Sequence, residues 1–125
     1  MKEYVDYLLK SNLQYLATVG LDHKPKVRPF QFMFEQDGKL WFCTSNQKEV
    51  YRELQQNKSI ELCASHNDLS WMRLCADVVF EDNMEVKEQV LKHSPLVKGI
   101  YHEATNPDFE VFYLDQIRAT ISRIS

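Results

Sequence analysis

A hairpin signal near the middle of the chain constrains the fold more than any other feature. Asp37-Gly38 stands between two runs of strand-forming residues, "KVRPFQFMFE" at 26–35 and "LWFCT" at 40–44. An Asp-Gly pair supplies the positive φ angles that a tight antiparallel turn needs. The sequence therefore predicts an antiparallel hairpin here. Its first strand contains Pro29, which has no N–H and belongs on a sheet edge or at a bulge.

The other apolar runs predict four more strands and two or three short helices. The strands are expected at 13–21, 59–65, 71–81 and 109–124, the last with a bulge near Asp115. Helices are expected at 2–10, 47–56 and 84–92, and residues 96–108 are expected to form a loop with a helical turn. Because the helices do not alternate with every strand, we expect a mainly β protein, a six-stranded antiparallel barrel covered by helices.

Composition limits the classes of function. At 125 residues, with a net charge of −3, the chain should form a single domain (1–125) with no general affinity for nucleic acid or anionic membranes. No apolar run approaches a membrane span, and the N-terminus is too polar for a secretory signal, so we expect a cytoplasmic protein. The three cysteines (Cys43, Cys63, Cys75) are far apart, so neither a disulfide framework nor a metal site is expected.

The turn that follows the strand 40–44 has the character of an anion site. Thr44, Ser45 and Asn46 bring hydroxyls and backbone N–H groups to the start of a helix, and Lys48 adds a cation. Asn46 with Glu49 is a capping-box pattern, which places the helix start near Gln47. A phosphate prefers this combination of helix start and lysine. The alternative is a capped helix whose lysine extends into solvent.

The strand 26–35 places Arg28 on the same face as three phenylalanines, Phe30, Phe32 and Phe34. An always-charged side chain at the end of an aromatic stripe needs a partner. That partner is either a ligand or a surface carboxylate beside an edge strand. On a later strand Trp71 is either a packing anchor or the wall of a flat cofactor site.

No hydrolase triad, carboxylate pair or glycine-rich phosphate motif is visible, and three glycines exclude both nucleotide fingerprints. We therefore nominate no catalytic residue.

The order of these segments resembles one family over nearly the whole chain. The segments that carry it are "YLATVG", "PKVRPFQF", "DGKLWFCTSNQKEVYRELQQN", "WMRLCADVVFEDN" and "FEVFYL". Together they resemble the short pyridoxamine 5′-phosphate oxidase-like flavoproteins, which are FMN-binding split barrels. They are most similar to the branch named for nitroimidazole resistance.

The resemblance implies an FMN site, a dimer and an activity. The flavin would be lined by Arg28, Pro29, Phe30 and Gln31, and its phosphate held by Cys43, Thr44, Ser45, Asn46 and Lys48. Trp71 matches a residue near the ring in some members. The family's usual homodimer places FMN at the subunit interface. Whether Arg28 meets the ring or the phosphate stays open.

Two departures from the oxidase pattern bear on the substrate. Gln47 replaces a second basic residue, and the tryptophan- and arginine-containing segment that holds pyridoxamine in the oxidases is missing. We therefore expect an FMN-dependent oxidoreductase acting on another small molecule, and no vitamin B6 oxidase. The alternatives are a non-catalytic module of the same fold that binds flavin, deazaflavin or haem, and a structural dimer without ligand.

Overall fold

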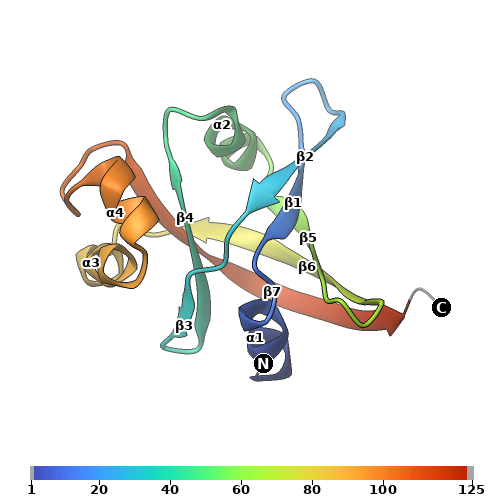
Figure 1. The fold of residues 1–125 in the computed structure, drawn as a ribbon. Coiled ribbons are helices and arrows are strands. Elements are labelled where there is room, and N and C mark those ends of the chain that lie inside the picture. Colours follow the sequence, from blue (N-terminus) through green and yellow to red (C-terminus); the bar gives the residue numbers. More distant parts are fainter. Residues whose placement is uncertain (1, 124–125) are drawn as a thin grey trace.

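Seven antiparallel strands form one sheet in the computed structural model, which describes residues 2–123 (Figure 1). Their order across the sheet is β2-β1-β5-β6-β7-β4-β3. They are β1 (Gln14–Val19), β2 (Pro25–Phe30), β3 (Phe34–Gln36), β4 (Lys39–Ser45), β5 (Ser59–Ser65), β6 (Ser70–Phe80) and β7 (Phe109–Arg123). The predicted mainly β antiparallel class is confirmed, with seven strands in place of six.

The extra strand arises because the predicted single strand over 26–35 is wrong. β2 ends at Phe30 and β3 begins at Phe34, and these two strands are the opposite edges of the sheet. Between them the Phe32 N–H donates to the buried Gln14 Oε1 at 2.6 Å. The three phenylalanines therefore do not share one stripe. Since consecutive strands form both edges, the sheet curls into a barrel that remains split.

Four helices accompany the sheet, one more than the upper number expected. They are α1 (Lys2–Leu9), α2 (Glu49–Gln56), α3 (Met84–His93) and α4 (Pro95–Tyr101). α4 occupies the segment predicted as a loop. Pro95 begins its first turn, and the Ser94 side chain accepts a hydrogen bond from the Val97 N–H. In the part of the chain that the structure describes, no helix has the length and apolar character of a membrane span.

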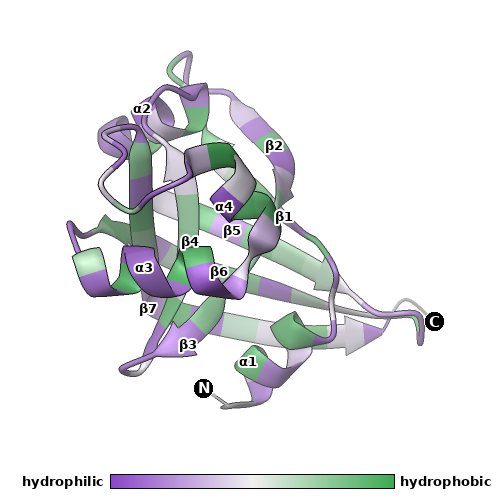
Figure 2. Ribbon diagram, turned by 60° about the vertical axis from the view of Figure 1, so that its left-hand side comes forward, coloured by the Kyte–Doolittle hydropathy of each residue, from purple (hydrophilic) through white to green (hydrophobic). Residues whose placement is uncertain are grey.

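Two hydrophobic cores lie on opposite faces of the curled sheet. The main core fills the barrel and takes side chains from α1 and α2, while the second lies under α3 and α4 against β4 and β7. α1 and α2 lie at opposite ends of the barrel (Figure 1). Hydrophobic and hydrophilic residues alternate along the helices and strands, as expected for elements buried on one face (Figure 2).

β7 carries the bulge predicted near Asp115. Asp77 of β6 faces Asp115, but Cys75 faces Arg118, so β7 has one residue more than its partner at this point. Gln116, within the bulge, has a φ of 55°. The strand was expected to reach residue 124, which lies outside the described residues.

Candidate functional site

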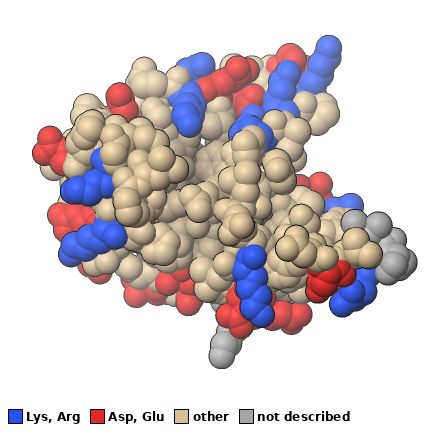
Figure 3. All heavy atoms as spheres, viewed as in Figure 1, with Lys and Arg blue, Asp and Glu red and all other residues tan. Residues whose placement is uncertain are grey.

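The start of α2 and the edge strand β2 enclose a cavity of about 380 Å³. It is lined by Lys26, Val27, Arg28, Lys48, Glu49, Val50 and Glu53. Figure 3 shows basic side chains gathered over α2 and β2, at the top of this face of the molecule. Two basic residues singled out in the sequence, Arg28 and Lys48, thus line the same cavity although they come from different elements.

The first turn of α2 carries no side-chain cap. The helix begins at Glu49, two residues later than the capping pattern indicated, and Lys48 is its N-cap residue with an extended backbone. The N-cap makes no side-chain hydrogen bond to the helix. The first N–H groups of an α-helix have no partner within it, so an uncapped start lining a cavity suits an anion.

Asn46 has a different role from the predicted cap. Its amide donates to the Pro107 carbonyl oxygen at 2.8 Å and to the Glu110 carboxylate at 2.9 Å. Ser45 Oγ accepts a hydrogen bond from the Gln47 N–H at 3.1 Å. Both side chains therefore fix the turn between β4 and α2, and the capping prediction is wrong because Asn46 is bonded to the segment that leads into β7.

Arg28 is held by a partly buried hydrogen-bond network. Its Nη2 donates to Glu53 Oε1 at 2.7 Å, and its Nη1 donates to Thr18 Oγ1 at 2.8 Å and to the Leu16 carbonyl oxygen at 3.2 Å. Thr18 Oγ1 in turn donates to Glu53 Oε1 at 2.7 Å. The arginine does pair with a carboxylate, as the edge-strand alternative expected. The carboxylate, however, is a buried one on α2, with its side chain 1% exposed.

The three cations of the cavity differ in what neutralises them. Lys26 pairs with Asp22 at 3.2 Å, and Arg28 pairs with Glu53. Within residues 2–123, no carboxylate lies at ion-pair distance from the Lys48 ammonium. Lys48 therefore brings a charge to the cavity that is not matched by a partner of its own.

Cys43 and Thr44 lie on opposite faces of β4. Cys43 packs beside the second core, and burial raises the pKa of its thiol to about 12, against the opposing effect of Lys48. The thiol is thus neutral and directed away from the barrel interior. Thr44 is buried, and its Oγ1 has no hydrogen-bond partner in the described structure. An orphaned buried hydroxyl is unusual, and this one stands at the strand end that leads to Lys48.

The other residues expected to line the flavin, Pro29, Phe30 and Gln31, are divided between core and solvent. The Phe30 ring packs in the main core, with its centroid 6.3 Å from that of Phe42 and 5.9 Å from that of Phe112. Pro29 and Gln31 are exposed. β2 is an edge strand, which confirms the expected position of Pro29.

Trp71 lies on the face of the sheet opposite to Arg28. On β6 the adjacent Met72 is fully buried in the barrel, so the half-exposed Trp71 points outward. The Arg73 guanidinium carbon lies 5.1 Å from the Trp71 ring centroid. One copy of the chain therefore does not bring Trp71 to the cavity that contains Arg28.

Sequence reasoning missed two polar residues of this region, Glu53 and Thr18. A signal existed for both. Glu53 shares the apolar face of α2 with Val50 and Leu54, and Thr18 is on the buried face of β1. A polar side chain on an apolar face needs a partner. Which partner it finds depends on how the sheet curls.

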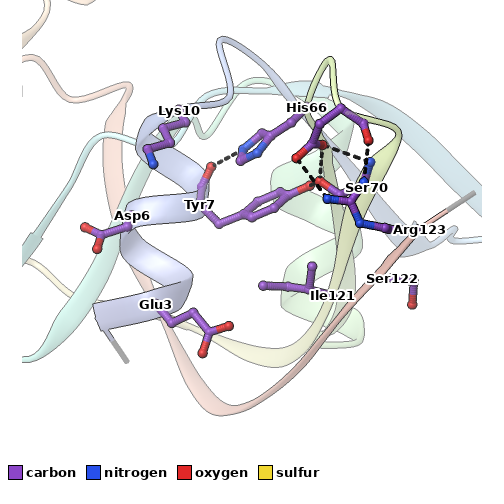
Figure 4. A pocket seen from close by; sticks show the side chains of 10 residues that line it. Glu3, Asp6, Tyr7, Lys10, His66, Ser70, Ile121, Ser122 and Arg123 are labelled. Atoms are coloured by element: carbon purple, nitrogen blue, oxygen red, sulfur yellow. Dashed lines mark hydrogen bonds and ion pairs between the residues drawn. The ribbon is translucent and has the colours of Figure 1, made fainter.

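A larger cavity, about 690 Å³, lies between α1, the β5–β6 turn and the end of β7 (Figure 4). Its polar groups bond to one another: the Tyr7 hydroxyl lies 2.7 Å from Ser70 Oγ, which donates to Asp68 Oδ1 at 2.5 Å. Glu3 and Asp6 also line it, which disfavours a phosphate. Among the described residues, no group of three or more histidine, cysteine and acidic side chains is arranged to hold a metal.

The open antiparallel sheet with its basic edge cavity defines a split-barrel protein. The chain belongs to the pyridoxamine 5′-phosphate oxidase family, whose sequence profile matches residues 1–120. This confirms the resemblance found in the sequence. No curated protein matches the chain.

Solved structures share the fold. A NimC/NimA family protein from Clostridium acetobutylicum is 33% identical, with a TM-score of 0.92 over 99% of this chain and 88% of that chain. General stress protein 26 from Bacillus anthracis is 18% identical, with a TM-score of 0.76 over 98% of both chains. A related protein of the pyridoxinephosphate oxidase family from C. acetobutylicum is 16% identical, with a TM-score of 0.73 over 98% of this chain and 93% of that chain. The last two show the fold alone.

Proposed function

We propose that the protein is a cytoplasmic FMN-binding flavoprotein that acts as an oxidoreductase on a small molecule. The observation that carries this proposal is the cavity at the start of α2, where Arg28 and Lys48 come together in a split barrel of this family. When bound, FMN would supply the electron-transfer chemistry, and the chain would supply binding and orientation.

The groups around the cavity fit a phosphate. Lys48 contributes a full charge without a partner of its own, and the uncapped first turn of α2 contributes N–H donors. Arg28 uses three of its five N–H groups within the protein, which leaves two for a ligand. These features favour the phosphate role of Arg28 over the ring role.

An isoalloxazine needs an apolar, uncharged surface beside the phosphate site. Figure 3 shows that the centre of this face, below the basic cluster, is free of charged side chains. Pro29 and Gln31 lie exposed on the adjoining edge, where a ring would find an interrupted backbone ladder to hydrogen-bond. The described surface is therefore compatible with the flavin half of FMN as well as with its phosphate.

A homodimer with FMN at the interface would account for Trp71. This side chain is half-exposed on the outer face of the sheet, away from the cavity of its own subunit. In a two-fold assembly, the outer face of one subunit can meet the ligand of the other. We therefore assign Trp71 to the partner's flavin.

Reconstitution with FMN tests the proposal. Purified protein titrated with FMN should quench flavin fluorescence at a stoichiometry of one per chain, and the complex should show a flavin absorption spectrum. Oxidation of NADH or NADPH by the complex, followed with a panel of acceptors, would separate an enzyme from a binding module. Failure to bind any flavin would refute the proposal, and a Soret band after haem addition would replace FMN by haem.

A further inference from the structure

We propose that Glu53 is a positioning residue of the phosphate site and strengthens phosphate binding although it carries a negative charge. It does so by fixing the guanidinium of Arg28 at the wall of the cavity. This inference rests on the proposed function, because it concerns the same cavity and the same ligand.

The network ties together three elements that are distant in the sequence. Arg28 is on β2, Thr18 on β1 and Glu53 on α2, and their side chains form a closed triangle of hydrogen bonds between 2.7 and 2.8 Å long. A guanidinium is a rigid planar fork, so bonds to two of its nitrogens fix the direction of all its N–H groups. The two N–H groups that remain are therefore oriented before any ligand arrives.

The burial of Glu53 holds Arg28 in this position. The Glu53 side chain is 1% exposed, and among the described residues Arg28 is the only cation at ion-pair distance from it. An unpaired buried carboxylate is strongly unfavourable, so Glu53 retains Arg28 in this position with or without a ligand. A donor that is already fixed costs less entropy when it binds a phosphate than a mobile arginine would.

Electrostatic repulsion alone predicts the opposite role for Glu53. A carboxylate in the wall of the cavity repels a phosphate, so its neutralisation should tighten binding. Glu49 provides the matched control: it lines the same cavity one turn earlier on α2, and it is exposed and bonded to no cation in the described structure. Glu53→Gln and Glu49→Gln remove the same charge from the same cavity. Only the first also weakens the support of Arg28, because a glutamine oxygen at this position can accept only neutral hydrogen bonds from Thr18 and lacks the charge that pairs with the guanidinium.

The test compares FMN with riboflavin, which lacks the phosphate, by fluorescence titration of both variants. We expect Glu53→Gln to raise the Kd for FMN roughly fivefold, the scale by which a hydrogen bond to a charged acceptor exceeds one to a neutral acceptor. Its Kd for riboflavin should change less than about twofold, because riboflavin has no phosphate for Arg28 to bind. A purely structural defect would instead weaken both ligands. Glu49→Gln should leave riboflavin unchanged and lower the Kd for FMN about twofold, the scale of a surface charge effect. Tighter FMN binding by both variants would overturn the inference.

Two further variants keep the test decisive. In an Arg28→Gln background, Glu53→Gln should no longer weaken FMN binding, because the residue through which it acts is gone. If Glu53→Gln does not fold, Thr18→Val removes the third member of the triangle and should also weaken FMN selectively. Wild-type protein that does not prefer FMN to riboflavin would refute the proposed function and this inference together. Preference for FMN that Glu53→Gln leaves intact would refute the inference alone.

Discussion

Replacement of Lys48 by alanine is the most direct test of the phosphate site. Lys48 stands at the start of α2 on the wall of the cavity, and no carboxylate in the described structure neutralises it. Its ammonium is therefore available to a dianionic phosphate. The substitution removes this charge and leaves the extended N-cap backbone, which an alanine also adopts.

The size of the effect follows from where the lysine lies. Two unit charges about 4 Å apart attract each other by roughly 4 kcal/mol at an effective dielectric constant of about 20. Lys48 is exposed, so water already satisfies part of its charge. We therefore expect a loss of about 1.5–3 kcal/mol, the range for hydrogen bonds to charged groups. This corresponds to a rise of roughly 10- to 150-fold in the Kd for FMN.

The assay is a pair of fluorescence titrations, with FMN and with riboflavin. Lys48→Ala should weaken FMN by the stated factor and leave riboflavin nearly unchanged. Lys58→Ala is the control, since Lys58 is exposed just beyond the other end of α2. Eight helical residues span about 12 Å, more than a Debye length at 0.1 M salt. Equal losses for both ligands would show that Lys48 acts through the fold, and the phosphate assignment would be wrong.

Four other predictions concern assembly, the substrate and the chemistry of the cysteine thiols. The FMN complex should have the mass of a dimer by light scattering, and a monomer mass with FMN bound would exclude an interfacial site. Pyridoxamine 5′-phosphate should not be converted to pyridoxal 5′-phosphate, because Lys48 is assigned to FMN while Lys26 and Arg28 already pair with carboxylates, which leaves no unpaired cation in the described cavity for a second phosphate. Turnover of about 1 per second or more would contradict this. At pH 8 iodoacetamide should label the exposed Cys63 and spare Cys43, whose pKa is raised to about 12 by burial. The unfolded chain ionises this thiol from about pH 9 and the folded chain only near 12, so the free energy of unfolding should fall as the pH rises through this window. Cys43→Ala should therefore flatten the alkaline loss of stability measured by urea titration.

The sequence predicted those elements whose signals are local. The Asp37-Gly38 turn, the amphipathic helix α2 and the bulge near Asp115 were all visible from residue type and spacing. The break after Phe30 was not, because "FQFMF" satisfies a strand pattern throughout its length. The chain leaves the strand because Phe32 bonds to Gln14 of a segment far away in the sequence.

The candidate site shows the same limit. Arg28 and Lys48 were identified as basic residues in unusual positions, and the barrel brings both to one cavity. Asn46 had a valid capping pattern, but a contact with Glu110 outweighed it. Trp71 was correctly placed on a strand, whereas the face it occupies depends on the register with neighbouring strands. Tertiary contacts of this kind cannot be inferred from spacing alone.

The two edges of the split sheet also bear on self-association. An exposed strand edge offers unpaired N–H and C=O groups to any other chain and so invites aggregation. β2 contains two prolines, Pro25 and Pro29, four residues apart, and proline fits an edge strand where its missing N–H would point away from the neighbouring strand. At the other edge β3 has only three residues. Both edges of the split barrel are therefore poor templates for pairing with the sheet of another chain. At β2 this protection comes from the two prolines, and at β3 from the shortness of the strand.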